Sequence, residues 1–265
     1  PPRKCSASAS DAGKHTVAFM FTDGDSITWD LGNFASPAYD WWGSKKRGQV
    51  PITWTFQPAL QELHPYFLSW VLKTKATGDV LIAGPSGAGY TYLDEYPSKA
   101  ARARFGDWTA TNIQKAGFTN MVNQIQVGTF TDAVEWEQFD ARPAPPEAVF
   151  VDEEVKLSIR GKAWRVRDAA GQPTDMIVSS RRHCLSKDFG DVNTTSLVAI
   201  LNRAPTDHTS TSGYSVIGVE VWGYGVTDIA GVAAQLNASR VRVVGIDEYV
   251  ACLKEHALPL PRSTV

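Results

Sequence analysis

Short apolar runs alternate along the chain with segments whose apolar residues recur every three or four positions. The runs VLIAG, from Val80, and VIGVEV, from Val216, are almost wholly apolar, which is typical of parallel strands covered on both faces. The segments between such runs have the periodicity of amphipathic helices. This alternation predicts an α/β fold, either a doubly wound sheet or a β/α barrel, and we favour a barrel of TIM type or of irregular form.

The individual elements follow from the same pattern. The strands are expected at Val17–Thr22, Pro51–Phe56, Asp79–Ala83, Met121–Val127, Ala148–Val151, Asp175–Ser179, Leu197–Leu201, Ser215–Trp222 and Val241–Val244. The helices are expected at Pro58–Lys75, Ser98–Ala116, Asp132–Phe139, Val226–Leu236 and Asp247–His256. Around residues 154–172 the chain instead predicts a β-hairpin inserted in the barrel, with turns near Gly161 and Gly171.

The strand–helix pattern also indicates the domain organisation. It begins after the polar opening PPRKCSASAS, so residues 1–15 are expected to be an extension or a linker from an upstream domain. Residues 16–260 are expected to form a single β/α-barrel-like domain, because the Pro-rich stretch ARPAPPEA does not interrupt the pattern. Hydrophobic residues make up 43% and charged residues 20% of the chain, which suits a globular protein with a full core.

Charge and hydropathy exclude two classes of partner. The formal net charge is −2 and the chain has no Lys/Arg run, so nucleic acid is not expected as a partner. No apolar run reaches the length of roughly 18 residues that a membrane-spanning helix needs. Two N-glycosylation sequons begin at Asn193 and Asn237. With the aromatic richness and the opening at Pro1, they favour a secreted or extracellular protein.

The chain has three cysteines, Cys5, Cys184 and Cys252, and no C-x-x-C motif, so a zinc or redox motif is not supported. An odd number fits one disulfide with one free thiol, and it also fits three thiols. Cys5 precedes the first predicted strand and Cys252 lies late in the last predicted helix, which would pack near that strand in a closed barrel. We therefore pair Cys5 with Cys252.

Carboxylates follow several predicted strands at their carboxyl ends, where α/β folds carry their chemistry. Asp23 and Asp25 flank a glycine after the first strand, Glu153 follows the fifth, and Glu220 interrupts an otherwise apolar strand. Such a group is seldom buried without a function or a partner. Asp23 and Asp25 are also common turn residues, Glu220 could simply point outward, and the oxygens of residues 23–25 would suit Ca²⁺.

The stretch LIAGPSGAGYTY, from Leu81, is the richest turn segment. It lacks the Lys of a phosphate-binding P-loop, and GPSGAG has the wrong order for a dinucleotide fingerprint. Gly84-Pro85-Ser86-Gly87-Ala88 departs from the G-x-S-x-G nucleophile turn at Ala88. What remains is a tight loop whose glycines let the backbone approach a ligand, with Tyr90 and Tyr92 beside it.

The glycine-rich stretch and several other segments resemble those of a known family. GAGYTY resembles the signature of the GxGYxYP family of glycoside hydrolases, with Leu93 where the signature has Pro. FTDGDSITW is similar to the family's Asp-Gly-Asp segment, and WWGSKKRGQVPITWTFQPAL, GYSVIGVEVWGYG and VRVVGIDEYV resemble its other conserved stretches. The resemblance covers most of residues 16–256. It implies the family's C-terminal domain, preceded by another domain of the same polypeptide, with a carbohydrate as substrate.

The residues support a sugar independently of that resemblance. Nine Trp and eight Tyr supply flat apolar faces for pyranose rings, although aromatics also fill cores, as we expect for Trp70 and Trp108. Glycoside hydrolysis needs two carboxyl groups. We assign them to Asp25 and Glu220, with Asp23 orienting and Glu153 as the substitute for Glu220. The predicted substrate-binding residues are Trp29, Trp42, Trp54, Ser86, Gly87, Gly89, Tyr90, Tyr92, Arg181, Arg203 and Trp222.

Two alternatives remain open at this point. A non-catalytic carbohydrate-binding or structural domain of a secreted glycoprotein would have the same aromatic residues but no pair of facing carboxyl groups. A metal-dependent deacetylase on a related barrel is suggested by Asp23 and Asp25, although the chain has no H-x-x-x-H pair. No resident metal or organic cofactor is predicted beyond the Ca²⁺ alternative.

Overall fold

The computed structural model describes residues 4–6, 8, 11–22, 27–125, 146–153 and 159–261. Within these ranges the side chains of residues 28, 29, 94, 123–125 and 153 are not described. The helix predicted at Asp132–Phe139 therefore lies outside the described residues, as do Asp23 and Asp25. No helix in the described part of the chain is both long and apolar enough to cross a membrane.

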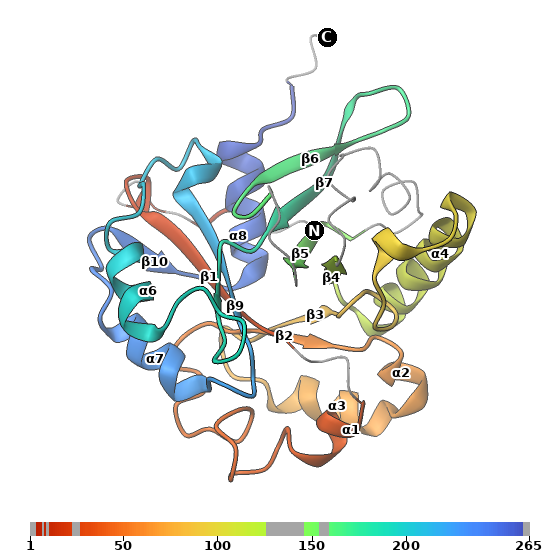
Figure 1. The fold of residues 1–265 in the computed structure, drawn as a ribbon, viewed down its shortest axis with the longest axis horizontal. Coiled ribbons are helices and arrows are strands. Elements are labelled where there is room, and N and C mark those ends of the chain that lie inside the picture. The colour runs from red at the N-terminus through yellow and green to blue at the C-terminus, as the bar shows by residue number, and fades with distance from the viewer. Residues whose placement is uncertain are drawn as a thin grey trace.

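One large, mostly parallel sheet forms the centre of the molecule (Figure 1). Its strands follow the order β6-β7-β5-β4-β3-β2-β1-β9-β8, and β10 pairs with β1. The strands are β1 (His15–Phe21), β2 (Thr53–Phe56), β3 (Val80–Ala83), β4 (Asn120–Ile125), β5 (Ala148–Glu153), β6 (Ala163–Arg167), β7 (Pro173–Ser180), β8 (His183–Leu185), β9 (Tyr214–Val219) and β10 (Val241–Val243). This arrangement is mixed α/β, and it is compatible with the predicted barrel-like fold.

Helices flank the sheet at several places in Figure 1: α6 and α7 lie side by side, and α2, α3 and α4 lie across the molecule from them. The helices are α1 (Ile27–Gly32), α2 (Leu60–Leu63), α3 (Pro65–Thr74), α4 (Lys99–Ala116), α6 (Thr194–Leu201), α7 (Val226–Ala234) and α8 (Ile246–Cys252), with a π-helical turn at Leu253–Ala257. Ser98 caps α4 by accepting from the Ala101 amide, and Gly117 ends it in the left-handed region at φ 74°.

The alternation of side chains along the strands separates two hydrophobic clusters. Phe19 and Phe21 of β1 belong to an outer cluster, together with residues of α3, α4, α6 and α7. Met20 of the same strand belongs to an inner cluster, which α8 joins through Tyr249. Because successive strand residues point to opposite faces, the residues in phase with Met20 define an inner face of the sheet.

β6 and β7 pair antiparallel, with Gly171 at φ 77° in the turn between them. The hairpin predicted around residues 154–172 overlaps this pair only in part, because residues 154–158 lie outside the described residues and β7 contains the strand predicted at Asp175–Ser179. One predicted strand is wrong: Leu197–Leu201 belongs to the helix α6. Its β-branched and apolar residues predicted a strand, but Asn193 and Ser196 form a capping box that starts a helix. Here the polar residues before the run, rather than the run itself, decide the structure.

The short segment between β7 and β8 forms hydrogen bonds with two strands, β5 and β9, that are not neighbours in the sheet. The Arg181 amide donates to the Val151 carbonyl of β5 at 3.1 Å, and the Arg182 amide donates to the Val216 carbonyl of β9 at 2.8 Å. Two consecutive residues thus connect β5 with β9, which are far apart in the order of paired strands. Side chains from β5 and β9 consequently lie near the same segment.

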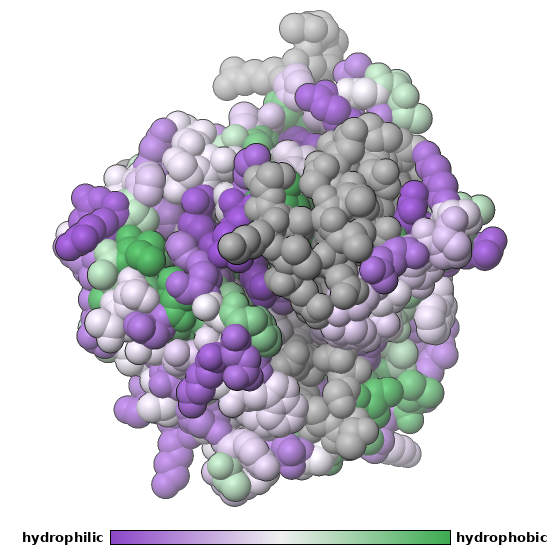
Figure 2. Space-filling view, in the orientation of Figure 1, coloured by the Kyte–Doolittle hydropathy of each residue, from purple (hydrophilic) through white to green (hydrophobic). Residues whose placement is uncertain are grey.

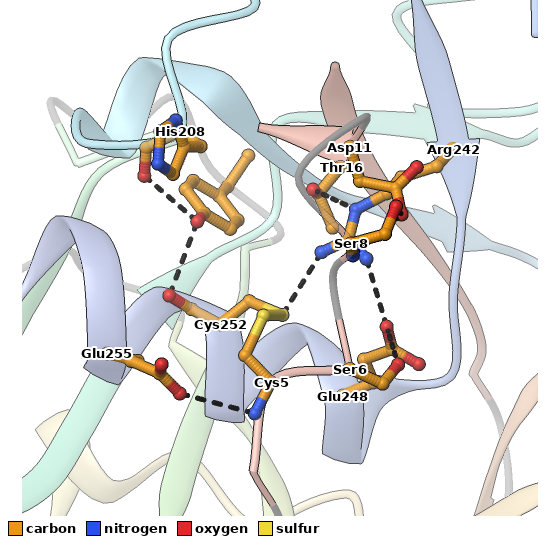
Figure 3. The surroundings of a disulfide bond; sticks show 11 residues. Cys5, Ser6, Ser8, Asp11, Thr16, His208, Arg242, Glu248, Cys252 and Glu255 are labelled. Carbon is orange, nitrogen blue, oxygen red and sulfur yellow. Dashed lines mark hydrogen bonds and ion pairs between the residues drawn. A yellow bond between two sulfur atoms is a disulfide. The ribbon is translucent and has the colours of Figure 1, made fainter. Parts of the chain in front are cut away.

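A disulfide joins the N-terminal segment to α8 (Figure 3). It links Cys5 with Cys252, the same two cysteines that we pair from the sequence. Around it the Ser6 hydroxyl donates to Glu248 at 2.6 Å, and Arg242 donates to Glu248 at 2.9 Å. The segment before β1 is therefore fixed to the last helix both covalently and by polar contacts.

The molecular surface in the view of Figure 2 is mostly hydrophilic. Hydrophobic residues form small separate groups there, of which one lies over α6 and another over α2. Ile200 of α6 and Leu63 of α2 are among the exposed large hydrophobic side chains. Exposed apolar side chains in such small groups are ordinary on a soluble domain.

Candidate active site

Glu220 lies directly after β9 and is 3% exposed. It is in phase with Gly218 on the inner face of that strand. Its Oε1 accepts from the Trp222 amide at 2.9 Å, and its buried Oε2 has no hydrogen-bond partner among the described residues. Burial raises the pKa of Glu220, the negative charge of Asp188 raises it further, and the Trp222 amide opposes the shift. These surroundings favour the neutral form of this carboxyl group more than water does.

Aromatic side chains surround the turn that carries Glu220. Trp222 is 58% exposed, and its ring packs edge-to-face on Trp41 at 5.5 Å between centroids. Trp41 is buried, donates its indole N–H to the Val221 carbonyl at 3.0 Å, and stacks on Tyr39 at 4.6 Å. Trp222 is a substrate contact predicted from the sequence, whereas Tyr39 and Trp41 are not among the predicted contacts.

A second inner carboxyl group, that of Asp152, belongs to β5 and is 2% exposed. It forms an ion pair with Arg181, whose side chain is also buried. Arg181 lies across the inner face against β9: a Cβ at Gly218 would be 3.3 Å from Arg181 Cδ. Gly218 therefore leaves room for this side chain. Arg181 was predicted to bind sugar hydroxyls, and the structure instead pairs it with Asp152.

The free thiol of Cys184 lies in the same region, since the Arg181 Nη1 donates to its sulfur at 3.4 Å. Burial raises the pKa of Cys184 to about 12, while the positive charge of Arg181 opposes this and the charges of Asp152 and Glu220 add to it. A thiol with this pKa is neutral at physiological pH and is a poor nucleophile. Because the thiol interacts electrostatically with Asp152, Arg181 and Glu220, these three side chains all lie close to Cys184.

The glycine-rich loop follows β3, and its geometry is explained largely by packing. Gly87 has φ 65°, and a Cβ there would lie 2.6 Å from Thr109 of α4. Its amide donates to Val122 at 3.2 Å, while the fully buried Ser86 donates its amide to Gly89 at 3.1 Å. The loop also contains cis peptide bonds at Gly84-Pro85 and Pro85-Ser86. Gly87 is thus required for close packing against α4, whatever else the loop contacts.

The two tyrosines after this loop remain available at the surface. Tyr90 is 47% exposed, its ring packs edge-to-face on Tyr92, and the two hydroxyls are 2.8 Å apart. A Cβ at Gly89 would meet no described atom within 4 Å. This end of the loop has the open backbone and polar aromatic groups that a ligand contact requires, so the predicted role of these residues stays a prediction.

Trp42 and Trp54 lie in the hydrophobic core, away from the surface at the carboxyl ends of the strands. Both are nearly buried in the outer cluster. Trp42 donates its indole N–H to Thr74 at 3.1 Å, and Trp54 donates to Asp79 at 3.1 Å and stacks on Phe21. Their rings fill the core and their polar atoms are satisfied within it, which differs from the substrate-binding position predicted for them.

Arg203 lies beyond the end of α6, in the connection that leads to the start of β9. It lines a cavity of about 410 Å³ together with His15, at the amino end of β1. Glu220 follows the carboxyl end of β9, so the structure does not bring Arg203 and Glu220 to the same end of the sheet. Burial lowers the pKa of His15 to about 4, and its ring contacts Pro205 and Ser215.

Several predicted residues lie outside the described part of the structure. These are Asp23 and Asp25, together with the side chains of Trp29 and Glu153. Both sequon residues, Asn193 and Asn237, are exposed. In the part of the chain that the structure describes, no three His, Cys, Asp or Glu side chains are grouped as metal ligands. Asp152 was a candidate carboxyl group from the sequence, because it follows an apolar run, but we assigned it no catalytic role there.

Comparison with known families gives one match that spans most of the chain. The family described as "GxGYxYP putative glycoside hydrolase C-terminal domain" matches residues 13–254. The match includes both the glycine-rich loop and the turn that carries Glu220. No protein among those with curated descriptions matches the chain.

Two solved structures have a similar fold. A protein described as a putative hydrolase from Bacteroides thetaiotaomicron VPI-5482 is 24% identical with a TM-score of 0.82, over 97% of this chain and 48% of that one. A protein described as a putative polysaccharide deacetylase from Mycobacterium smegmatis is 13% identical with a TM-score of 0.54, over 100% of this chain and 98% of that one. At these identities the likeness concerns the fold alone. The chain spans about half the length of the first of these proteins.

Proposed function

Since the chain belongs to the GxGYxYP putative glycoside hydrolase family, we propose that it is a carbohydrate-acting hydrolase that uses two carboxyl groups at the carboxyl ends of the strands. One observation carries the proposal: Glu220 is a buried carboxyl group with a raised pKa, and its Oε2 accepts no hydrogen bond from a described residue. Such a group is suited to general acid catalysis, because it keeps its proton at a pH where most carboxyl groups have lost theirs.

The hydrogen bond at Glu220 indicates which oxygen carries the proton. Oε1 already accepts from the Trp222 amide, so the proton is more stable on Oε2, which has no such donor. In the proposed reaction Oε2–H donates to the leaving oxygen of the glycosidic bond. A second, ionised carboxyl group then acts as nucleophile or as the base that activates water.

We propose Asp25 as that second group, with Asp23 orienting it and Glu153 as the substitute for Glu220. Asp23 and Asp25 follow Thr22 in the chain, and the Thr22 amide donates to the Val219 carbonyl at 3.0 Å, next to Glu220. The segment therefore starts beside the turn that holds the proposed acid. The alternative that the oxygens of residues 23–25 hold a Ca²⁺ ion stays open beside this proposal.

We also propose substrate contacts, glycosylation sites and a partner domain for this chain. Trp222, Tyr90 and Tyr92 would contact the sugar from the ends of β9 and β3. Exposure of Asn193 and Asn237 supports their proposed use as glycosylation sites in a secreted protein. An upstream domain of the same polypeptide is the proposed partner, which the family's description as a C-terminal domain supports.

One observation favours the alternative of a non-catalytic carbohydrate-binding domain. Of the two inner carboxyl groups, that of Asp152 is already paired with Arg181. Asp152 is therefore less available for proton transfer, whereas glycoside hydrolysis requires two carboxyl groups. Among the described residues, the exposed Asp188 is another carboxyl group close enough to act on Glu220. The two functions differ in whether removing Glu220 or Asp25 abolishes sugar release.

The test compares sugar release and glycan binding by the same proteins. Reducing-sugar release from a glycan panel is measured for the wild type, Glu220→Gln and Asp25→Asn. Loss of the acid or its partner should lower turnover by about 10²- to 10⁴-fold, while binding persists. The control Glu62→Gln removes a carboxyl group that is 57% exposed and pairs with Lys115. Release that survives in both site variants would contradict the mechanism, and binding without release in the wild type would favour the alternative.

A further inference from the structure

Two exposed aromatic rings are fixed by one buried indole near Glu220. Trp41 is 3% exposed and lies between Tyr39, on which it stacks at an interplanar angle of 18°, and Trp222, which it meets at 87°. Tyr39 and Trp222 are 39% and 58% exposed. A row of three contacting rings therefore extends beyond the turn of Glu220, and its two outer members are open to solvent.

The loop that carries Tyr39 and Trp41 is held rigidly against the start of α7. The Asp40 carboxylate accepts from the Ser44 hydroxyl, the Thr227 amide and the Thr227 hydroxyl, and the Asp40 carbonyl accepts from Val226. A Cβ at Gly225 would lie 2.4 Å from Asp40 Oδ2, so a glycine is needed there. The aromatic row is consequently ordered before any ligand arrives, which lowers the entropic cost of binding.

The row continues directly into the candidate active site. The amide of Trp222 donates to Glu220 Oε1, so the exposed ring and the buried carboxyl group belong to the same turn. The neighbouring loop lies close as well, because a Cβ at Gly223 would be 3.1 Å from the Lys187 amide and 3.0 Å from Glu220 Oε2. A chain lying on the aromatic row would thus lead towards the proposed general acid.

We propose that Tyr39 and Trp222, held by Trp41, form a sugar-binding platform outside the carboxyl site, and that the substrate is an oligo- or polysaccharide. The proposal rests on the proposed function for the position of the bond that is cleaved. Flat, half-exposed aromatic rings bind the apolar faces of pyranose units, and their polar edges remain hydrated. Because the exposed rings of Tyr39 and Trp222 lie on different sides of Trp41 and at different angles to it, we expect them to contact different sugar units of one chain.

The experiment uses native affinity electrophoresis with soluble neutral polysaccharides (β-glucan, xylan, mannan and pullulan), followed by oligosaccharides of increasing length from the glycan that retards the protein. Tyr39→Ala and Trp222→Ala should each weaken retention roughly tenfold, as loss of a central aromatic contact does. Trp108→Ala is the matched control, because Trp108 is 55% exposed on α4 and packs edge-to-face on Phe105. It should bind as the wild type does.

The outcomes separate this platform from the hydrolase mechanism. Retention that grows with chain length and is lost in Tyr39→Ala and Trp222→Ala supports the platform. Unchanged retention in both variants, retention equal for a monosaccharide and its oligomers, or no retained glycan in the panel overturns it. Glu220→Gln should keep full retention while sugar release is lost. If Glu220→Gln still releases sugar, the mechanism is wrong and the platform stands.

Discussion

Asp152 and Glu220 are both buried on the inner face of the sheet, 2% and 3% exposed, but among the described residues only Asp152 has a cationic partner. Asp152 forms an ion pair with Arg181, whereas Glu220 accepts hydrogen bonds from neutral groups, among them the Trp222 amide at Oε1. The first is stabilised as an anion by its partner. Burial raises the pKa of the second, so its neutral form is favoured relative to that of an exposed carboxyl group.

This difference shows how two buried carboxyl groups in one protein can have separate roles, depending on whether a cation lies beside them. A buried ion pair contributes little net stability, yet leaving one partner alone is costly. A buried carboxyl group without such a partner shifts its pKa instead, and that shift is what acid catalysis uses. Asp152 with Arg181 is therefore a structural pair, while Glu220 is the candidate for chemistry.

The largest expected effect comes from breaking the pair. Arg181→Met leaves Asp152 buried without a cation and should lower the free energy of unfolding by about 3–5 kcal/mol. The measurement is equilibrium denaturation in urea, with circular dichroism as the signal. A loss below about 1 kcal/mol would mean that Asp152 is solvated or paired in another way.

The double variant Asp152→Leu/Arg181→Met sharpens the same point and remains informative if the single variant does not fold. Replacing both charges by apolar groups removes the uncompensated ion, so most of the stability should return. The double variant should differ from the wild type by less than about 2 kcal/mol in the same assay. Additive losses would show that the two side chains do not act as a pair.

A smaller and opposite effect is expected at Glu220. Its pKa is raised in the folded state, so folding takes up a proton and stability falls as the pH rises from the unfolded pKa through the folded one. Glu220→Gln removes this penalty, which amounts to about 1.4 kcal/mol for each pKa unit. The variant should be more stable than the wild type at pH 7 and similar to it at pH 4.

Thermal unfolding of both proteins across this pH range checks the sign. Glu62→Gln, at an exposed carboxyl group, should leave the pH dependence of the melting temperature unchanged. If Glu220→Gln is destabilised at pH 7, Glu220 is ionised in the folded protein and the contrast with Asp152 fails.

The smallest effect is expected at Gly223. A methyl group there would lie 3.0 Å from Glu220 Oε2 and 3.1 Å from the Lys187 amide, which displaces water from the carboxyl group. Gly223→Ala should raise the pKa of Glu220 further and move the alkaline limb of the activity profile upward by a few tenths of a pH unit. The stability loss should stay below about 1 kcal/mol. A downward shift of that limb would contradict an acid role for Glu220.

Much of the fold follows from the sequence because parallel strands are apolar on both faces. Residues 216–219 and 80–83 lie in predicted strands for that reason. The strand predicted at Leu197–Leu201 is wrong because its composition fits either element, and the deciding hydrogen bonds come from Asn193 and Ser196. Local capping competes with composition, and here capping prevails.

For the aromatic residues, the sequence did not predict which side chains are buried and which are exposed. Trp70 and Trp108 were expected in the core, yet they are 38% and 55% exposed, while Trp42 and Trp54 are buried. Trp54 is in phase with Phe56 on a short strand, so alternation indicated a shared face but not which face is covered. The pairing of Arg181 with Asp152 could not be predicted either. It joins the segment after β7 to β5, and these meet only in the complete sheet.

The disulfide between Cys5 and Cys252 makes one covalent loop of 247 residues' separation. A protease that cuts the backbone once anywhere between these two positions would therefore leave a single molecule, which separates into fragments only after reduction. Nicked protein would migrate near full length on a non-reducing gel. The crosslink thus keeps the strand of Glu220 and the segment after β1 in one particle even after the chain between them has been cleaved.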